Sequence, residues 1–406
     1  MSHLSYMEKL LDGADIKWKP LWQVTIWDKK FNAVERFKQP KVINYQYLLA
    51  ADLFKLEQEG GDVFLLSTGE RTGWTTEALA GSYLREGEVV TIPWGKSRPV
   101  RDVIKYYKGR FVTADNRIAT SNNTEELLNK YLYYWLMSQS QIIDSYYRGS
   151  GIQHPSMADV LDILIPLPSI EIQAEIVRIL DAFTAMTAEL TAELNMRKKQ
   201  YNYYRDQLLS FDLSADQAGE GEGVTPMSIG DIYDFQYGKG NTIPKEGGQY
   251  PVYGSNGVVG THHEYNSEDS PVIGHIGAYA GIVNWGKGKH FVTYNGVICK
   301  HKSKEVNPQF AYYILLAQDF GSKAKNSSQP FVSYDTLKEP VVLIPSLAEQ
   351  ERIVSILDKF DALTSSITEG LPREIELRQK QYEYYRDLLL SFPASPAGGP
   401  KSDEAA

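Results

Sequence analysis

A dense run of basic side chains between residues 96 and 117 could bind polyanions. It holds seven basic residues against the two acids Asp102 and Asp115, and four aromatic residues are interleaved with it. The basic residues are Lys96, Arg98, Arg101, Lys105, Lys108, Arg110 and Arg117, and the aromatic ones are Trp94, Tyr106, Tyr107 and Phe111. Cations bind phosphates and aromatic rings stack on bases, so the run could contact nucleic acid. A solvated face is an equally common role for such a run.

A second basic run, Lys300, Lys302 and Lys304, follows Lys287 and Lys289. The chain as a whole carries a formal net charge of −9, with 51 acidic against 42 basic residues. Most of the acidic residues lie outside the two basic runs. Local distribution of charge, more than the net value, therefore decides whether nucleic acid can bind.

Motifs that would bind a nucleotide are incomplete. Residues 281–288 match the first seven positions of a phosphate-binding loop, but Gly288 stands where a Ser or Thr would hold Mg²⁺. Residues 95–97 read Gly-Lys-Ser, but Val90 replaces the upstream glycine and Pro99 interrupts any helix. Both segments are better explained as turns.

Motifs of methyl transfer and metal binding are incomplete as well. Residues 307–310 are one residue away from the loop with which amino-methyltransferases hold a flipped base, and residues 235–240 resemble a cofactor-binding glycine loop. No β-α-β alternation accompanies them, so a helix start and a hairpin glycine explain them better. His262 and His263 are adjacent and lack a Cys or carboxylate cluster. We therefore predict no catalytic residue and no metal site.

The elements that must position the basic runs are two copies of one segment. Residues 165–211 recur as a segment of closely similar sequence, residues 343–392, whereas the stretches between the copies differ. A chain that repeats its framework and varies its inserts is built as two pseudo-equivalent halves that carry two different readers.

Both copies have the apolar spacing of a coiled-coil helix, with seam residues seven apart. The expected seam residues are Ile176, Leu180, Phe183, Leu190, Leu194, Tyr201, Tyr204, Leu208, Ile353, Leu357, Phe360, Tyr382, Tyr385 and Leu389. The second copy has four more residues, about one helical turn, between Asp358 and Tyr382 than the first has between Asp181 and Tyr201, and Gly370-Leu371-Pro372 there predicts a kink or a break near Pro372. The first copy carries a tandem tetrapeptide, residues 187–190 followed by residues 191–194.

The two inserts, residues ~14–166 and ~224–344, contain β-branched and aromatic runs broken by glycine. Residues 111–113 match residues 291–293, so we expect both inserts to share one fold, a mixed sheet with a few helices. Residues 6–11 echo residues 204–209, which predicts that the two termini lie near each other.

Composition bounds the class of protein. The single Cys299 excludes a disulfide framework and suits a reducing, cytoplasmic environment. No apolar run approaches the ~20 residues that span a membrane. The sequence after Met1 shows no signal peptide.

The repeated segments also carry a specific resemblance. Their shared pattern is Gln-x-x-Ile-Val-x-Ile-Leu-Asp-x-Phe, beginning at Gln173 and Gln350, followed by Arg-x-Lys-Gln-Tyr-x-Tyr-Tyr-Arg-Asp. It strongly resembles the central and distal regions of the specificity subunit of type I restriction–modification systems, and the Thr-Ala-Glu-Leu tandem resembles the type IC branch. These segments are near a quarter of the chain. Weaker pieces that look like target recognition domains are residues 149–154, 251–257, 273–277 and 327–330.

The resemblance implies an α+β fold. Two mixed α/β target recognition domains are separated by two long antiparallel coiled-coil helices in a pseudo-two-fold repeat. The expected segments are the N-terminal target recognition domain with a short helical stub (1–166), the central helix (167–211), a linker (212–223), the C-terminal target recognition domain (224–344), the distal helix (345–392) and a disordered tail (393–406).

The implied function is that of a non-catalytic DNA specificity subunit. Each target recognition domain would bind one half of an asymmetric two-part DNA site, and two tetrapeptides predict a non-specific spacer of about six base pairs. The alternatives are a self-contained DNA adenine methyltransferase and an assembly scaffold that does not bind DNA. The implied partners are double-stranded DNA, two methyltransferase subunits that dock on the helices, and restriction subunits. S-adenosylmethionine, ATP and Mg²⁺ would bind those partners, and no cofactor would bind this chain.

Base-reading residues must come from the inserts, because Arg and Lys can pair with guanine and Asn or Gln with adenine. Phosphate contact is the commoner role for any single Lys. The candidates are Lys96, Arg98, Arg101, Lys105, Arg148 and Gln153 in the first insert, and Tyr253, Asn256, His275, Lys287, Lys289, Lys302 and Gln329 in the second.

Overall fold

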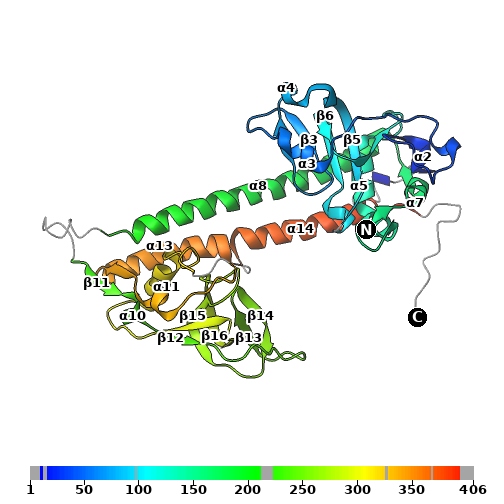
Figure 1. Cartoon of the computed structure of the whole chain (residues 1–406). Coiled ribbons are helices and arrows are strands. Elements are labelled where there is room, and N and C mark those ends of the chain that lie inside the picture. Colours follow the sequence, from blue (N-terminus) through cyan, green and yellow to red (C-terminus); the bar gives the residue numbers. More distant parts are fainter. Residues whose placement is uncertain are drawn as a thin grey trace. The chain divides into compact units, whose positions relative to one another are not determined.

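A computed structural model of the chain describes residues 10–11, 16–96, 98–211, 223–324, 328–366 and 369–393 (Figure 1). The chain divides into two compact units: unit 1 comprises Met1–Ala188 and Glu376–Ala406, and unit 2 comprises Glu189–Ile375. Each unit thus contains one insert and parts of the repeated helices. Most of the predicted stub and linker, and all but the first residue of the predicted tail, lie outside the described residues.

Unit 1 is built on a six-stranded mixed sheet. Its strands are β2 (Thr25–Trp27), β3 (Val63–Leu66), β4 (Gly73–Thr75), β5 (Arg85–Pro93), β6 (Lys105–Thr113) and β7 (Asn116–Ser121). The strand order is β2-β7-β5-β6-β3-β4, and only β3 and β6 pair in parallel. These runs are rich in Val, Ile, Thr and aromatic residues, which suit a half-buried pleated surface.

Smaller elements complete unit 1. They are β1 (Lys17–Pro20), β8 (Tyr147–Arg148), β9 (His154–Pro155), β10 (Leu164–Leu167), α2 (Leu21–Val24), α3 (Ala50–Leu53), α4 (Glu77–Ala80), α5 (Asn129–Ser138), α6 (Ser140–Ser145), α7 (Met157–Asp162) and the 3₁₀ helices η1 (Arg36–Lys38), η2 (Phe54–Leu56), η3 (Gly81–Tyr83) and η4 (Val100–Asp102). Strands β1 and β10 pair antiparallel, and β10 leads directly into the first long helix. The α5 residues Tyr131, Leu132 and Leu136 are buried in the main core.

Unit 2 repeats this topology. Its sheet strands are β12 (Tyr233–Tyr237), β13 (Tyr250–Gly254), β14 (Gly257–His262), β15 (Ser267–Gly274), β16 (Val283–Val292) and β17 (Gly296–His301). Their order is β12-β17-β15-β16-β13-β14, and only β13 and β16 pair in parallel. Strand for strand this is the order of unit 1, so the prediction that both inserts share one fold is confirmed.

The remaining elements of unit 2 also have counterparts in unit 1. They are β11 (Thr225–Ser228), β18 (Val341–Ile344), α10 (Ile229–Ile232), α11 (Pro308–Ala317) and α12 (Tyr334–Lys338). Strands β11 and β18 pair antiparallel, as β1 and β10 do, and β18 leads into the second long helical segment.

The long helices are α8 (Ile170–Leu208), α13 (Leu347–Ser365) and α14 (Gly370–Leu389). In unit 1, Ile176 of α8 and Leu389 of α14 share the core, and farther along Phe183 stacks on Tyr385 with ring centroids 5.2 Å apart. Residue numbers rise along one helix as they fall along the other, so the two run antiparallel (Figure 1).

Unit 2 has the equivalent pairing between α8 and α13. Leu208 packs against the core that holds Leu357, and Tyr204 stacks on Phe360 at 5.7 Å. Numbers again run in opposite directions. The predicted antiparallel pairing of the repeated helices is therefore present in both units.

The distal segment is broken, since α13 ends at Ser365 and α14 begins at Gly370 with Pro372 in its first turn. Gly370 has φ +74°, and a Cβ there would collide with the carbonyl oxygens of Ala362 and Leu363. Only glycine fits both constraints without strain.

Candidate nucleic-acid interface

Four segments of unit 1 meet in a group that we name the first loop cluster, residues 66–71, 94–96, 113–117 and 148–154. The Ala114 amide donates to the Leu66 carbonyl at 2.9 Å, and the Lys96 amide donates to the Gln153 carbonyl at 3.0 Å. The cluster therefore brings residues 149–154, one of the pieces that look like a target recognition domain, next to the start of the basic run.

Five segments of unit 2 form the second loop cluster, residues 237–240, 253–257, 274–279, 293–296 and 328–332. The Tyr294 amide donates to Gly240 at 2.8 Å, the His275 amide to Asn295 at 2.8 Å, and the Gly277 amide to Pro330 at 2.8 Å. Much of the other three motif pieces, 251–257, 273–277 and 327–330, lies together here, apart from Ser327, which is outside the described residues.

Two of the predicted DNA-binding residues of unit 1 have internal partners. Lys96 pairs with Asp144, and only 10% of its side chain is exposed. Lys105 donates to the carbonyl and hydroxyl oxygens of Ser67 at 2.8 Å each and to the Gly69 carbonyl. Burial lowers the pKa of Lys105 to about 8. Both ammonium groups hold the first loop cluster together.

The other four candidates of unit 1 are more accessible. Arg98 is exposed beside Glu70, Arg101 beside Asp102 and Glu383, and Arg148 is 76% exposed with Asp159 at 3.4 Å. Gln153 is half-buried and forms an isolated antiparallel β-bridge with Lys96.

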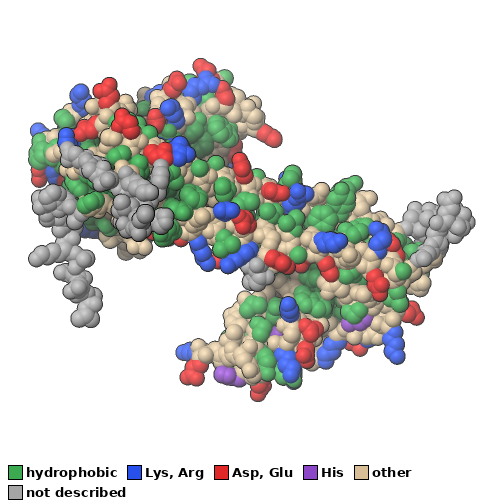
Figure 2. All heavy atoms as spheres, turned by 180° about the vertical axis from the view of Figure 1, so that it is seen from behind, with side chains coloured by type: hydrophobic (Ala, Val, Ile, Leu, Met, Phe, Trp, Pro, Cys, Tyr) green, Lys and Arg blue, Asp and Glu red, His purple; other side chains and the backbone are tan. Residues whose placement is uncertain are grey.

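Acidic neighbours offset most of the basic run. Arg110 pairs with Asp62 and Glu77, and Lys108 pairs with Glu88 at 3.5 Å. On the face shown in Figure 2, basic and acidic side chains are interspersed over the surface. Exposed ion pairs of this kind contribute little to stability.

The candidates of unit 2 divide in the same way. Asn256, Lys287 and Gln329 are exposed. Lys289 lies 4.7 Å from the Tyr265 ring centre, and Lys302 pairs with Asp234 at 2.9 Å.

Tyr253 and His275 are buried within the second loop cluster, where their side chains hydrogen-bond to neighbouring backbone. The Tyr253 hydroxyl donates to the Trp285 carbonyl at 3.2 Å, and His275 Nδ1 donates to the Val332 carbonyl at 3.1 Å. Tyr294 stands edge-on to the His275 ring and is exposed, so it presents the aromatic surface there.

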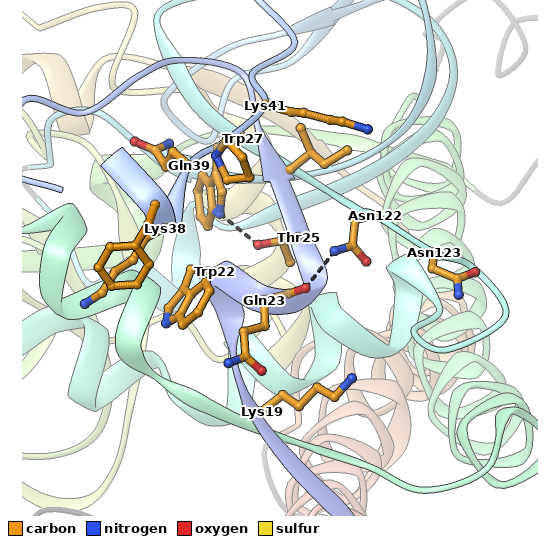
Figure 3. A pocket seen from close by; sticks show the side chains of 13 residues that line it. Lys19, Trp22, Gln23, Thr25, Trp27, Lys38, Gln39, Lys41, Asn122 and Asn123 are labelled. Carbon is orange, nitrogen blue, oxygen red and sulfur yellow. Dashed lines mark hydrogen bonds between the residues drawn. The ribbon is translucent and has the colours of Figure 1, made fainter. Parts of the chain in front are cut away.

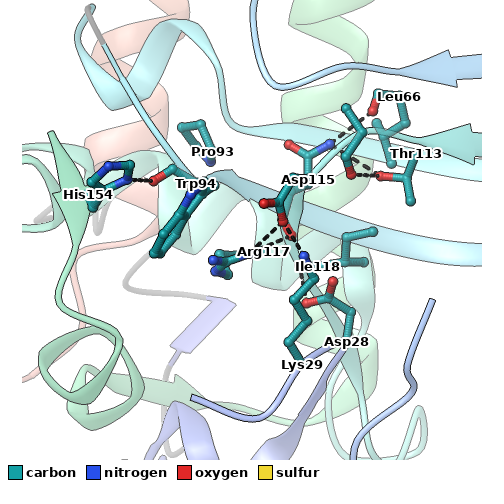
Figure 4. A network of polar contacts seen from close by, with 12 residues as sticks. Asp28, Lys29, Leu66, Pro93, Trp94, Thr113, Asp115, Arg117, Ile118 and His154 are labelled. Atoms are coloured by element: carbon teal, nitrogen blue, oxygen red, sulfur yellow. Dashed lines mark hydrogen bonds and ion pairs between the residues drawn. The ribbon is translucent and has the colours of Figure 1, made fainter. Parts of the chain in front are cut away.

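A partly buried charged network includes Arg117 and Asp115 of the first loop cluster (Figure 4). Arg117 contacts Asp115 at 3.0 Å, and Asp115 also pairs with Lys29. Asp28 accepts a hydrogen bond from the Ile118 amide at 3.1 Å, and burial raises its pKa to about 6. The Arg117 guanidinium lies 3.8 Å from the ring centre of Trp94.

A pocket of about 690 Å³ beside β2 was not anticipated from the sequence (Figure 3). Trp22 and the exposed Phe37 meet edge-to-face at 5.5 Å in its wall. It is lined also by Lys19, Gln23, Lys38, Gln39, Lys41, Asn122 and Asn123. Amide, ammonium and aromatic groups together suit nucleic acid, but they come from three separate stretches of sequence (19–27, 37–41 and 122–123) with no common motif.

The incomplete motifs have structural roles. Asn307 caps α11, accepting from the Gln309 and Phe310 amides at 2.9 and 3.1 Å, and Pro308 is the first residue of the helix. Most of residues 281–288 belong to strand β16. Within the described residues no three His, Cys, Asp or Glu side chains form a group that could hold a metal ion, and no helix is long and apolar enough to cross a membrane.

The predicted seam residues differ in burial. Ile176, Leu180, Ile353, Leu357 and Leu389 are buried. Phe183, Leu190, Leu194, Tyr201, Leu208, Phe360 and Tyr382 are half-buried, whereas Tyr204 and Tyr385 are exposed on one side while they stack on the other.

Each unit fixes its helix to its insert by the same tyrosine–aspartate contact. The Tyr134 hydroxyl donates to Asp181 at 2.5 Å in unit 1, and the Tyr313 hydroxyl donates to Asp358 at 2.5 Å in unit 2. Burial, and then the hydrogen-bonded carboxylate, raise the pKa of both tyrosines.

Comparison with known proteins agrees with this duplicated architecture. The family model described as "Type I restriction modification DNA specificity domain" matches residues 51–197 and 221–377. The chain is 36% identical to the type I restriction enzyme EcoR124I/EcoR124II specificity subunit of Escherichia coli, over 97% of this chain and 98% of that protein. It is 31% identical to a putative type I restriction enzyme specificity subunit of Haemophilus influenzae, over 96% and 98% of the two chains. The crystal structure of a type I restriction–modification S subunit from M. genitalium superposes with a TM-score of 0.60 at 20% identity, covering 95% of this chain and 98% of that one.

Proposed function

Because the chain belongs to the family of type I restriction–modification DNA specificity subunits, we propose that its units bind the two halves of an asymmetric two-part DNA site. The family fixes the general role, which is DNA target recognition without catalysis in this chain. In this division of the role, the first loop cluster reads one half-site and the second loop cluster reads the other.

The observation that carries the proposal is one topology with two unlike loop clusters. The sheets of both units have the same strand order, and both helices are fastened by the same contacts. The first cluster is charged, with Arg148 exposed in it and Arg98 exposed next to it, whereas the second presents Tyr294, Asn256 and Gln329. Unlike surfaces on one scaffold suit two different half-sites.

The helices would set the span between the half-sites. Helix α8 has 39 residues and is about 60 Å long. That is ample to hold two readers one DNA turn, about 34 Å, apart. We expect the two tetrapeptides between Thr187 and Leu194 to set a spacer of about six base pairs. Each tetrapeptide lengthens the helix by about 6 Å.

The same helices would dock two methyltransferase subunits. Tyr203 and Tyr204 meet edge-to-face at 5.5 Å, and Tyr384 and Tyr385 repeat that contact at 5.4 Å. Tyr203 is 62% exposed and Tyr384 is 65% exposed. Exposed tyrosine is typical of protein interfaces, and a surface that occurs twice suits two copies of one partner.

Catalysis would then belong to the partners. Methyltransferase subunits would bring S-adenosylmethionine, restriction subunits would bring ATP and Mg²⁺, and this chain would bind none of them. We place the complex in the cytoplasm, where the buried thiol of Cys299 stays reduced.

Methylation-sensitive sequencing of host DNA, with and without the gene for this chain, tests the division of labour. The expected result is a set of methylated sites, present only with the gene, whose two conserved halves differ and are separated by a fixed non-specific spacer. A continuous site, or one whose halves are identical, would contradict the proposal.

A further inference from the structure

Trp94 and His154 form an exposed aromatic pair in the first loop cluster. Their ring centroids are 4.4 Å apart, and 37% of Trp94 is exposed. His154 Nδ1 lies 2.9 Å from the Trp94 carbonyl oxygen. A carbonyl only accepts, so Nδ1 carries the hydrogen, and in the neutral ring Nε2 is an acceptor.

The polar edges of this pair are available to a ligand. Across the described part of the chain, neither Nε2 of His154 nor the indole N–H of Trp94 has a hydrogen-bond partner. The pair therefore presents one acceptor and one donor. Ile152, which is 67% exposed, lies next to them because it packs on Gly95.

The charged network behind Trp94 holds its ring in place. Figure 4 shows Trp94 between His154 on one side and Arg117 on the other. The Arg117 side chain is 7% exposed, and Asp115 holds it in turn. Trp94 therefore cannot rotate without breaking its contacts with both neighbours.

Stability alone does not explain that network. Buried ion pairs seldom stabilise more than apolar residues of the same size, because desolvation offsets their attraction. Burial raises the pKa of Asp28, so this carboxylate too is held at some cost. The charged network lowers stability, but it holds the exposed ring of Trp94. Its presence is explained if that ring must be positioned accurately.

Exposed cations accompany the pair. Arg148 is paired with His154 in the β8–β9 ladder, and Arg98 follows two residues after Lys96. Arginines beside a preorganised aromatic edge are suited to phosphates, while the edge itself reaches the bases.

Unit 2 has a related arrangement at the same ladder. The bridge between Lys96 and Gln153 corresponds to that between Ile276 and Phe331. A histidine ring nitrogen donates across each ladder, from His154 in unit 1 and from His275 in unit 2. In unit 2 the exposed ring at this place is Tyr294, so the presented chemistry differs.

We infer that Trp94 and His154 read an A·T base pair from the major groove in the half-site bound by unit 1. Adenine presents N7 as an acceptor next to the N6 amino group as a donor, which complements the indole N–H and His154 Nε2. Ile152 would meet the thymine methyl group. This inference rests on the proposed function, because it assigns residues within one of the two readers.

Methylation by the complex with methyltransferase subunits tests the assignment. The substrates are duplexes that carry every single base-pair change in both half-sites, and 7-deazaadenine, which lacks the N7 acceptor, at each adenine. For wild type, 7-deazaadenine at one position of a single half-site should lower the methylation rate at limiting DNA about tenfold. For the W94F protein, placing 7-deazaadenine at that position should cause no further fall in the methylation rate. The H154A protein should no longer discriminate between base pairs at the same position.

The matched control is W74F, since Trp74 is an exposed tryptophan on β4 that packs edge-to-face on Phe64. It should behave as wild type. Unchanged recognition of the other half-site shows in each variant that the protein is folded. Equal loss on all sequences, or unchanged discrimination in both W94F and H154A, would overturn the inference. Absence of any two-part site for wild type would instead overturn the proposed function.

Discussion

Gln173 and Gln350 occupy the same position in the two units and make the same three hydrogen bonds. Gln173 Nε2 donates to the carbonyls of Pro168 and Glu126 at 2.9 and 2.8 Å, and its Oε1 accepts from the Leu128 amide at 3.0 Å. Gln350 does the same with Pro345, Glu305 and Asn307. Both side chains are fully buried, so each glutamine fastens an insert to the first turn of a long helix.

Replacing Gln173 by Leu should destabilise unit 1, because three buried backbone groups would lose their partner. We expect the free energy of unfolding in urea to fall by about 2–4 kcal/mol. Q350L should produce a similar fall. The control is Q207L, on the exposed face of α8, which should change stability by less than about 0.5 kcal/mol. Equal midpoints for Q173L and Q207L would show that the buried contacts are not needed.

The exposed tyrosines give a prediction about assembly. Y203A and Y384A should each weaken the binding of one methyltransferase subunit by about tenfold or more. Tyrosines that become buried on binding contribute much of the affinity at many interfaces. Native mass spectrometry of the mixed proteins should show one bound subunit for each single variant and none for the double variant. M196A, an exposed methionine on the same helix, is the control. Two bound subunits in the double variant would exclude this docking surface.

The raised pKa of Asp28 predicts a pH dependence of stability. Burial raises it from 3.8 to about 6, so between these values the folded protein keeps a proton that the unfolded chain has released. Stability from this group is therefore present below about pH 4 and lost as pH rises through 6. Because the amide side chain introduced by D28N cannot ionise, wild type should lose up to about 3 kcal/mol relative to D28N between pH 4 and 7. Parallel unfolding curves for the two proteins at both pH values would contradict this.

Cofactor binding separates this account from that of a self-contained methyltransferase. We expect isothermal titration of the isolated chain with S-adenosylmethionine or with Mg²⁺-ATP to give no binding heat, whereas the complex with methyltransferase subunits should bind S-adenosylmethionine. Asn307 is committed to capping α11, so it is not available to hold a flipped base. Saturable binding of S-adenosylmethionine by the isolated chain would refute the division of catalysis.

The fold could be predicted from the sequence because its strongest signals are local. Heptad spacing marked Ile176 and Leu180 as seam residues, and both are fully buried. Repetition then implied that the helices pair and that both inserts share a topology. The break at Gly370 was indicated by the neighbouring proline.

The candidate site could be predicted only in outline. Whether each basic side chain is exposed or paired depends on residues far away in the chain. Lys96 is buried against Asp144, and Lys105 is bonded to residues of another hairpin, so neither is a free surface charge. Conversely, Trp94 was only one of several interleaved aromatic residues in sequence. Its role emerges from contacts with His154 and Arg117, which no local pattern encodes.

The most direct test of the whole account is the spacer length after deletion of residues 191–194. Removing one tetrapeptide shortens α8 by about 6 Å while leaving both loop clusters intact. Methylation-sensitive sequencing of DNA from cells that carry the deletion variant should reveal the same two half-sites separated by a shorter spacer. Altered half-sites, or an unchanged spacer, would contradict the claim that the helices set the distance between two independent readers.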